Sequence, residues 1–375
     1  MIAAVQNDLY RVFTAYREGI VRKASIQGDP APILPRELDF NQLSDSACLG
    51  LSSPQERLIA RKAGAAGQRG FLAARAGDLD LAQTHFATSW ALWEKLEDGF
   101  CQAWTAGLIE SFQAYLDYRS SRRNDARLRI ERALDSALLL EDRYGLTLFE
   151  LLRIQLGHNL ARIDWRFGLY EGAFALAGAL IGHLQGSRQE LPFHRDWRAS
   201  RMLACPSYMR RRMTLQIARE AIGLLVAHPE PAYWDAFLGE AKIGDRPADR
   251  RLFGDPRLYL WLCARRARNL GDRRQYLDTL VEILVSGPLG LGTAYYSILV
   301  DFADFCSTEQ SVAARKVIDF FSRDAPKWKG LPTLLAERLA EIFGGRRGPS
   351  ANLAMAPESI GIGGELATRG TASLG

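Results

Sequence analysis

Apolar side chains recur every three or four residues along most of this chain, which is the spacing of one buried face of an α-helix. Near the N-terminus, for example, Leu9, Val12, Phe13, Tyr16 and Ile20 lie on one side of such a helix. Short breaks rich in glycine, proline or polar residues separate the periodic stretches. The pattern therefore predicts helices over residues 2–23, 54–75, 79–97, 100–119, 123–142, 146–167, 170–185, 207–227, 231–241, 256–269, 272–286, 293–306, 309–323 and 330–343.

The larger breaks divide the chain into five parts. Residues 1–53 contain the first helix and a loop, and residues 54–185 form a regular helical region. Residues 186–205, which are rich in arginine and contain Gly186 and Pro192, are interpreted as a basic linker. A second helical half follows over 206–343. Beyond it glycine, alanine, serine and threonine dominate without periodicity, so residues 344–375 are expected to be a disordered tail.

One short pattern recurs within 54–185. Gly77 is followed five residues later by Ala82, and Gly168 by Ala173, with apolar or small residues four and seven positions further on. Ala126 keeps the same spacing without the turn glycine. This spacing is typical of a helical hairpin whose second helix packs closely on the first through a small residue. The expected fold is all-α, an elongated right-handed helical-repeat array, or α-solenoid, with a disordered C-terminal tail.

These positions resemble those of the tetratricopeptide-repeat (TPR) superfamily, especially its longer-helix relatives in bacterial regulators and scaffolds. The resemblance covers about a third of the chain. Its matching positions are Gly70, Gly77, Ala82, Phe86 and Ser89 in the first unit, Ala126, Ile130 and Ala133 in the second, and Ala161, Gly168 and Ala173 in the third. The resemblance implies a concave groove, lined by the first helix of each hairpin, that binds a peptide or helix. The residues then expected to face or flank that groove are Arg153, Gln155, His158, Arg162 and Arg166.

The cysteine content and the apolar runs favour a protein of the cytoplasm. The five cysteines are scattered and never stand in C-x-x-C spacing, which argues against a disulfide framework and suits a reducing compartment. The N-terminal residues lack the features of a signal peptide. The longest apolar run, residues 174–181, is far shorter than the ~20 residues of a membrane-spanning helix.

No motif of metal binding, cofactor binding or catalysis stands out. The five histidines are widely separated from one another and from the cysteines, so neither a metal site nor a cofactor is expected. Asp301 and Asp304 put two carboxylates on nearly one helix face, a spacing that can hold Mg²⁺. The alternative interpretation is the solvated face of a helix whose apolar side points inward.

A local cluster of arginines interleaved with aromatic residues is the clearest charged feature of a chain whose net charge is +5. Guanidinium groups bind phosphate bidentately and aromatic rings stack on bases, so this composition suits a surface for nucleic acid or another anionic ligand. Helix capping and ion pairing with carboxylates would explain the same arginines without any ligand. The candidate residues are Arg195, Trp197, Arg198, Arg201, Arg210, Arg211 and Arg212.

Three functions are therefore open. The first expectation is a non-catalytic cytoplasmic adaptor or scaffold that binds a protein or peptide segment in the concave groove. The alternative is a regulator that binds nucleic acid or an anionic ligand through the arginine cluster. The second alternative is an all-helical enzyme of unrecognised type that starts from Asp301 and Asp304.

Overall fold

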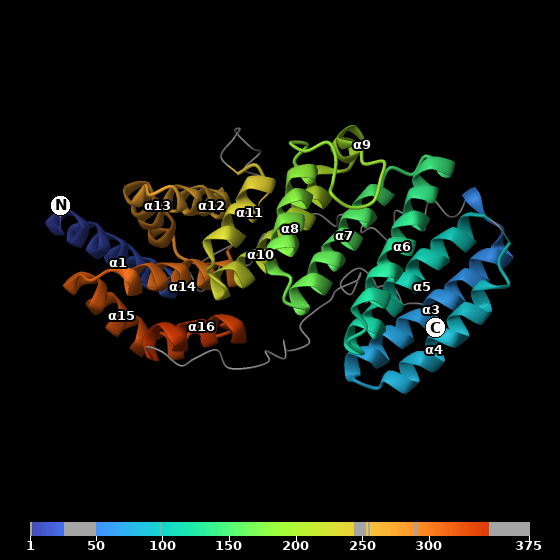
Figure 1. Ribbon diagram of the computed structural model, residues 1–375, viewed down its shortest axis with the longest axis horizontal. Helices are drawn as coiled ribbons and strands as arrows, with labels where there is room; N and C mark the ends of the chain where they lie inside the picture. The colour runs from blue at the N-terminus through green and yellow to red at the C-terminus, as the bar shows by residue number, and fades with distance from the viewer. Residues whose placement is uncertain are drawn as a thin grey trace. The chain divides into compact units, whose positions relative to one another are not determined.

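The computed structural model describes residues 2–25, 50–97, 99–243, 253, 256–288 and 291–344, and within the first helix the side chains of residues 7–19 only. These residues form helices and turns, with no strand among them, which confirms the prediction of an all-α protein (Figure 1). The predicted tail beyond Gly344 lies outside the described residues.

The helices begin and end close to the residues that the apolar spacing predicts. None of them, within the described ranges, combines the length and hydropathy that crossing a membrane requires. Their bounds are α1 (Ile2–Ser25), α3 (Pro54–Ala76), α4 (Leu79–Trp93), α5 (Phe100–Arg119), α6 (Arg123–Tyr144), α7 (Phe149–Arg166), α8 (Tyr170–Leu184), α9 (Ala199–Ala204), α10 (Ser207–Ala227), α11 (Pro231–Glu240), α12 (Pro256–Asn269), α13 (Arg273–Val285), α14 (Thr293–Thr308), α15 (Val312–Asp324), the 3₁₀ turn η2 (Ala325–Lys327) and α16 (Thr333–Gly344).

The described residues divide into two compact units. Unit 1 contains residues 2–25, 177–187 and 207–344, and unit 2 contains residues 50–176 and 188–206. The division falls inside α8. Residues 188–205, interpreted from the sequence as part of a linker, belong to unit 2 together with the helices that precede them.

Unit 2 is built from helical hairpins that begin and end at recognisable residues. Ser53 and Glu56 form a reciprocal capping box at the start of α3. Gly77, with φ +90°, ends α3 in the left-handed conformation, and the Asp78 side chain then accepts a hydrogen bond from Leu81 N at the start of α4. In the hairpins that follow, α3 packs on α4 and α5, and α6 packs on α5 and α7.

The small residues of the repeated pattern lie where α3 and α4 cross. Ala82 and Phe86 are fully buried, and a Cβ added to Gly70 would lie 3.0 Å from the Phe86 ring. The Ser89 hydroxyl donates to the carbonyl of Ala63 at 2.7 Å, across the same contact. The repeated pattern therefore indicates close packing of two helix backbones and does not identify a binding partner.

In unit 1 the N-terminal helix packs on elements that follow it by more than 250 residues. The apolar stripe of α1, which includes Leu9, Val12 and Tyr16, is buried, and α1 contacts α13 and α15. The Tyr16 hydroxyl donates to Asp324 Oδ2 at 2.6 Å, and the Phe13 and Phe320 rings meet edge to face. The apolar face of α1 that the sequence predicts is therefore buried within unit 1.

Candidate functional site

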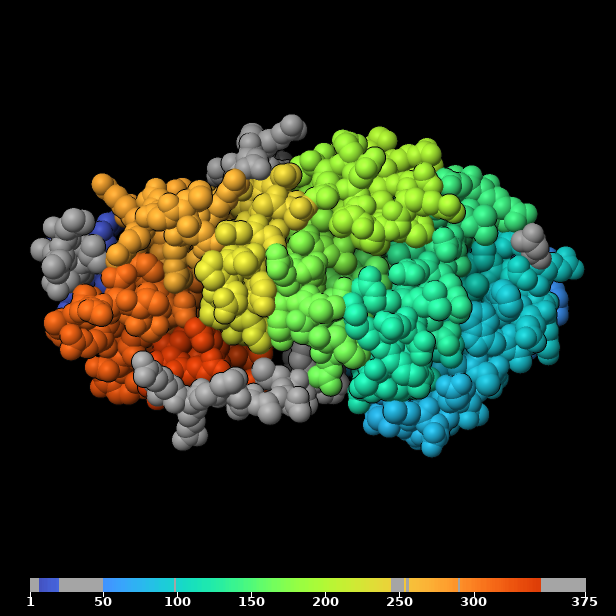
Figure 2. All heavy atoms as spheres, in the orientation of Figure 1, coloured from blue at the N-terminus to red at the C-terminus, as the bar shows by residue number. Residues whose placement is uncertain are grey.

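Residues 188–206, here called the strap, belong to unit 2 (Figure 2, yellow-green). They contact the last turn of α6 through Arg201 and the first turn of α7 through Arg198. The strap contains the short helix α9, which the sequence pattern does not predict. His194 and Asp196 both have positive φ, 58° and 56°, in the left-handed region that non-glycine residues rarely adopt. Backbone of this kind persists only where its surroundings hold it, and the contacts around Arg153 do so.

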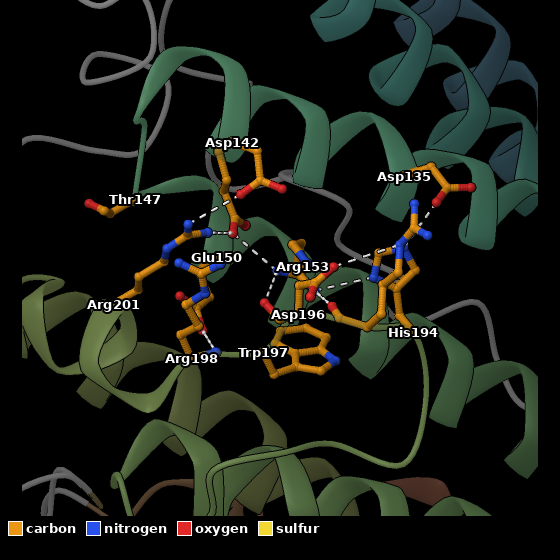
Figure 3. A network of polar contacts seen from close by, with 12 residues as sticks. Asp135, Asp142, Thr147, Glu150, Arg153, His194, Asp196, Trp197, Arg198 and Arg201 are labelled. Atoms are coloured by element: carbon orange, nitrogen blue, oxygen red, sulfur yellow. Dashed lines mark hydrogen bonds and ion pairs between the residues drawn. The ribbon is translucent and has the colours of Figure 1, made fainter.

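Arg153 is the centre of these contacts (Figure 3). Its side chain is completely buried, and its Nη1 donates to Glu141 Oε2 at 3.0 Å and to the Asp196 carbonyl at 3.3 Å. Its Nη2 donates to the Arg195 carbonyl and lies 3.2 Å from His194 Nδ1. The Trp197 ring covers the guanidinium, with the Arg153 Cζ 3.9 Å from the ring centroid. One guanidinium thus holds four consecutive strap residues.

Two buried glutamates that the sequence analysis does not single out complete the network. Glu141, in the last turn of α6, also accepts from Arg201 Nη1 at 3.1 Å. Glu150, in the first turn of α7, accepts from the backbone N–H of Arg198 at 3.2 Å. Both side chains are buried. Only the α7 part of this network is visible in the sequence, because Arg153 lies next to the apolar stripe of α7 and Glu150 precedes it by one helical turn. The partners on α6 and in the strap are not marked by any local pattern.

The buried environment of Glu141 raises the pKa of its carboxyl group. Burial raises the pKa of Glu141 to about 7, the attraction of Arg153 lowers it, and the neighbouring charge of Glu150 raises it again. Arg201 lowers the pKa by a smaller amount. A carboxyl group with this pKa changes its charge in the neutral pH range.

This raised pKa predicts a pH dependence of stability. Between about pH 4.5 and 7 the folded chain keeps a proton on Glu141 that the unfolded chain has released, so stability contributed by this group falls as the pH rises. The loss should approach 3 kcal/mol, at roughly 1.4 kcal/mol for each pH unit. Urea unfolding at a series of pH values measures it. The difference between wild type and Glu141→Gln isolates this group, and an equal pH slope in both proteins would contradict the assignment.

The residues predicted to line a groove on α7 do not form one set. Gln155, His158 and Arg162 lie on one face of α7 with Asn159, and all four are buried. Arg166 follows on the same face, one turn further on, and is exposed. Arg153 is two residues before Gln155, about 200° away around the helix, and its side chain contacts the strap. Arg153 therefore belongs to the network and not to the polar face of α7.

The arginine cluster is also divided between different surroundings. Trp197 is buried on Arg153, so its ring is not presented for stacking on a base, and Arg201 is paired with Glu141 and Asp142. Arg195 and Arg198 have exposed side chains in the strap. Arg210 donates to the Leu184 carbonyl at 3.1 Å in unit 1, where Arg211 is partly buried and Arg212 exposed on α10.

In unit 1, Asp301 and Asp304 are paired with arginines from neighbouring helices. Asp301 is buried and lies 2.9 Å from Arg268 Nη1 and 3.2 Å from Arg265 Nε. Tyr276 donates its hydroxyl to Asp301 at 2.7 Å, and burial together with Asp301 raises the tyrosine pKa. Asp304 accepts from Arg338 at 2.6 Å and from Arg268 at 3.3 Å. The two carboxylates thus join α12, α13, α14 and α16.

This pairing predicts that Asp301 is needed for stability without any metal. Asp301→Asn should lower the free energy of unfolding by about 2 kcal/mol, because it leaves Arg265 and Arg268 buried with one carboxylate fewer. Thermal unfolding of both proteins, with and without millimolar Mg²⁺, measures this. If Mg²⁺ instead raises the melting temperature of the wild type but not that of Asp301→Asn, the metal-binding interpretation is supported.

Within the described ranges, no three side chains of histidine, cysteine, aspartate or glutamate are placed to hold a metal ion together. Comparisons of the chain with protein-family models, with curated proteins and with solved structures find no match.

Proposed function

We propose that this protein is a non-catalytic adaptor or scaffold of the cytoplasm, built as a TPR-like helical array, that holds an extended protein segment along the polar face of α7. The residues of this face are Gln155, His158, Asn159 and Arg162, spaced so that they lie on one side of the helix. A buried polar side chain needs a partner for each hydrogen-bonding group, and one donor of Asn159 has none among the described residues. The main chain of an extended peptide supplies donors and acceptors at regular intervals.

The amide of Asn159 is the observation that supports this proposal. Arg162 Nη1 donates to Asn159 Oδ1 at 3.1 Å, and because a guanidinium has only donors, this contact identifies the oxygen of the amide. The other amide atom, Nδ2, is then a buried donor, and no acceptor for it exists among the described residues. Such a group costs about 1–3 kcal/mol until an acceptor reaches it. A peptide carbonyl is an acceptor of suitable size and strength, and because Asn159 is buried, the segment reaches this donor only when the polar face of α7 opens.

The experiment uses the full chain and a phage-displayed library of random dodecapeptides. Affinities of the selected peptides are measured by fluorescence anisotropy for wild type and Asn159→Asp. This substitution keeps the oxygen that Arg162 contacts and replaces the donor with a second oxygen. The affinity should fall at least tenfold, since a hydrogen bond is lost and two acceptors face each other. Circular dichroism confirms that both proteins fold alike.

Two further variants separate the proposal from the arginine-cluster alternative. Asn124→Asp changes an exposed asparagine on α6 and should leave the affinity unchanged. Replacement of Arg210, Arg211 and Arg212 by glutamate should also leave it unchanged. Selection of no peptide, or peptides that bind Asn159→Asp as well as wild type, would refute the proposal. Binding that only the triple variant loses, and that moderate salt abolishes, would favour an anionic ligand.

A further inference from the structure

The outer face of α3 carries exposed leucines between cations that have no counter-ion. Leu58 and Leu72, which are 47% and 48% exposed, lie on this face with the exposed Ala65 midway between them. The exposed cations on both sides of this line make no hydrogen bond or ion pair with any described residue, and they are Arg61, Lys62 and Arg69. Beyond its first turn α3 contains no acidic residue. This face therefore combines an apolar stripe with uncompensated positive charge.

The outer face of α6 has a similar arrangement with the opposite charge. Leu128 and Leu139, about three turns apart, are 46% and 45% exposed. Glu131 and Asp135 are exposed between them. Glu131 has no ion-pair partner among the described residues, and Asp135, although it lies 3.2 Å from a strap histidine, has a side chain that is 64% exposed. Arg132, at the edge of this face, is paired with a glutamate of α5.

The two outer faces do not meet within one copy of unit 2. α5 packs on both α3 and α6, and the leucines and the charged side chains of the two outer faces are exposed (Figure 1). An exposed apolar stripe beside unpaired charge is typical of an interaction surface, and its partner needs an apolar stripe with the opposite charge. The outer face of α6 in a second copy of the chain has both features.

We propose that the outer face of α3 in one copy binds the outer face of α6 in a second copy. Along an α-helix 14 residues span about 21 Å and 11 residues span about 17 Å, so the two leucines of α6 fit within the span of the two leucines of α3, on either side of Ala65. This register places the acidic residues of α6 opposite the cations of α3. The contact joins two different faces and is therefore heterologous, so each copy binds two others and the assembly grows into rings or chains.

This contact does not involve the polar face of α7, so it does not depend on the proposed function. It covers one helix face on each copy, which places it at the small end of protein interfaces, and we expect it to be weak. Since exposed charges supply part of the attraction, about 0.5 M NaCl should weaken it.

Sedimentation velocity of the full chain at low ionic strength measures the assembly. The weight-average mass should rise above that of one chain as the concentration increases from about 5 to 200 μM. Leu72→Gln should weaken the association about fivefold, because it removes an apolar side chain from the contact. Leu81→Gln is the matched control, since it changes a leucine of α4 that is 46% exposed and lies outside both faces. A chain that stays monomeric, or equal effects of the two substitutions, would overturn the proposal.

Charge reversal tests which two faces meet. One variant carries Arg61→Glu, Lys62→Glu and Arg69→Glu on α3, and the other carries Glu131→Lys and Asp135→Lys on α6. Each variant alone should be monomeric, because its two faces then have charges of the same sign. An equimolar mixture of the two should assemble again, since each reversed face then meets a face of the opposite charge. Circular dichroism checks that both variants are folded. A mixture that stays monomeric, or a single variant that assembles like the wild type, would refute the contact.

Discussion

Replacing Arg153 by methionine should lower the free energy of unfolding by about 3 to 5 kcal/mol at pH 8. Methionine keeps an apolar side chain of similar length under the Trp197 ring but removes every hydrogen bond of the guanidinium. Glu141 and the carbonyls of Arg195 and Asp196 then remain buried without their donor. Breaking a buried ion pair from one side has this magnitude, because the remaining charge stays out of water. Urea unfolding measures the loss.

Arg195→Met is the control for this prediction. Arg195 is two residues from Trp197, and its side chain is 76% exposed, so its replacement should change stability by less than about 0.5 kcal/mol. Arg153→Met should also raise the pKa of Glu141 further, since Arg153 is the main influence that lowers it. A loss of stability below about 1 kcal/mol in Arg153→Met would mean that water reaches Glu141 and the strap carbonyls in solution, contrary to their burial in the structure.

Apart from the short helix α9, the helices and their breaks are predictable from this sequence because both depend on neighbouring residues. The spacing of the apolar residues follows from the 3.6 residues per turn of an α-helix. Gly77 ends α3 because the chain there has φ +90°, a backbone conformation that glycine adopts more readily than other residues. The small residues of the repeated pattern also predict close packing of adjacent helices, and Ala82 and Gly70 show it. In each case the residues that determine the structure lie within one or two helices.

The contacts of the candidate site join residues that are far apart in the sequence, and the sequence alone could not predict them. Glu141 and Arg201 are sixty residues apart, and nothing local marks them as partners. Pro192 and the arginines favour a linker, whereas burial of Trp197 on Arg153 makes the strap part of unit 2. The spacing of Asp301 and Asp304 is visible in the sequence, but the arginines that pair with them come from α12 and α16. Local periodicity contains no information about such pairs.

Two glycines of α8 should respond in opposite ways to the same substitution. A Cβ at Gly178 would lie 2.3 Å from the Phe237 carbonyl oxygen and 3.1 Å from Ala241 N, within unit 1. Both obstacles are backbone atoms, which cannot rotate away, so Gly178→Ala should lower the free energy of unfolding by at least about 3 kcal/mol. A Cβ at Gly172 meets nothing within 4 Å, so Gly172→Ala should raise it by about 0.5 kcal/mol through helix propensity. The two variants should therefore differ by more than ~3 kcal/mol in chemical unfolding. Equal stabilities would mean that α8 and α11 do not approach each other this closely.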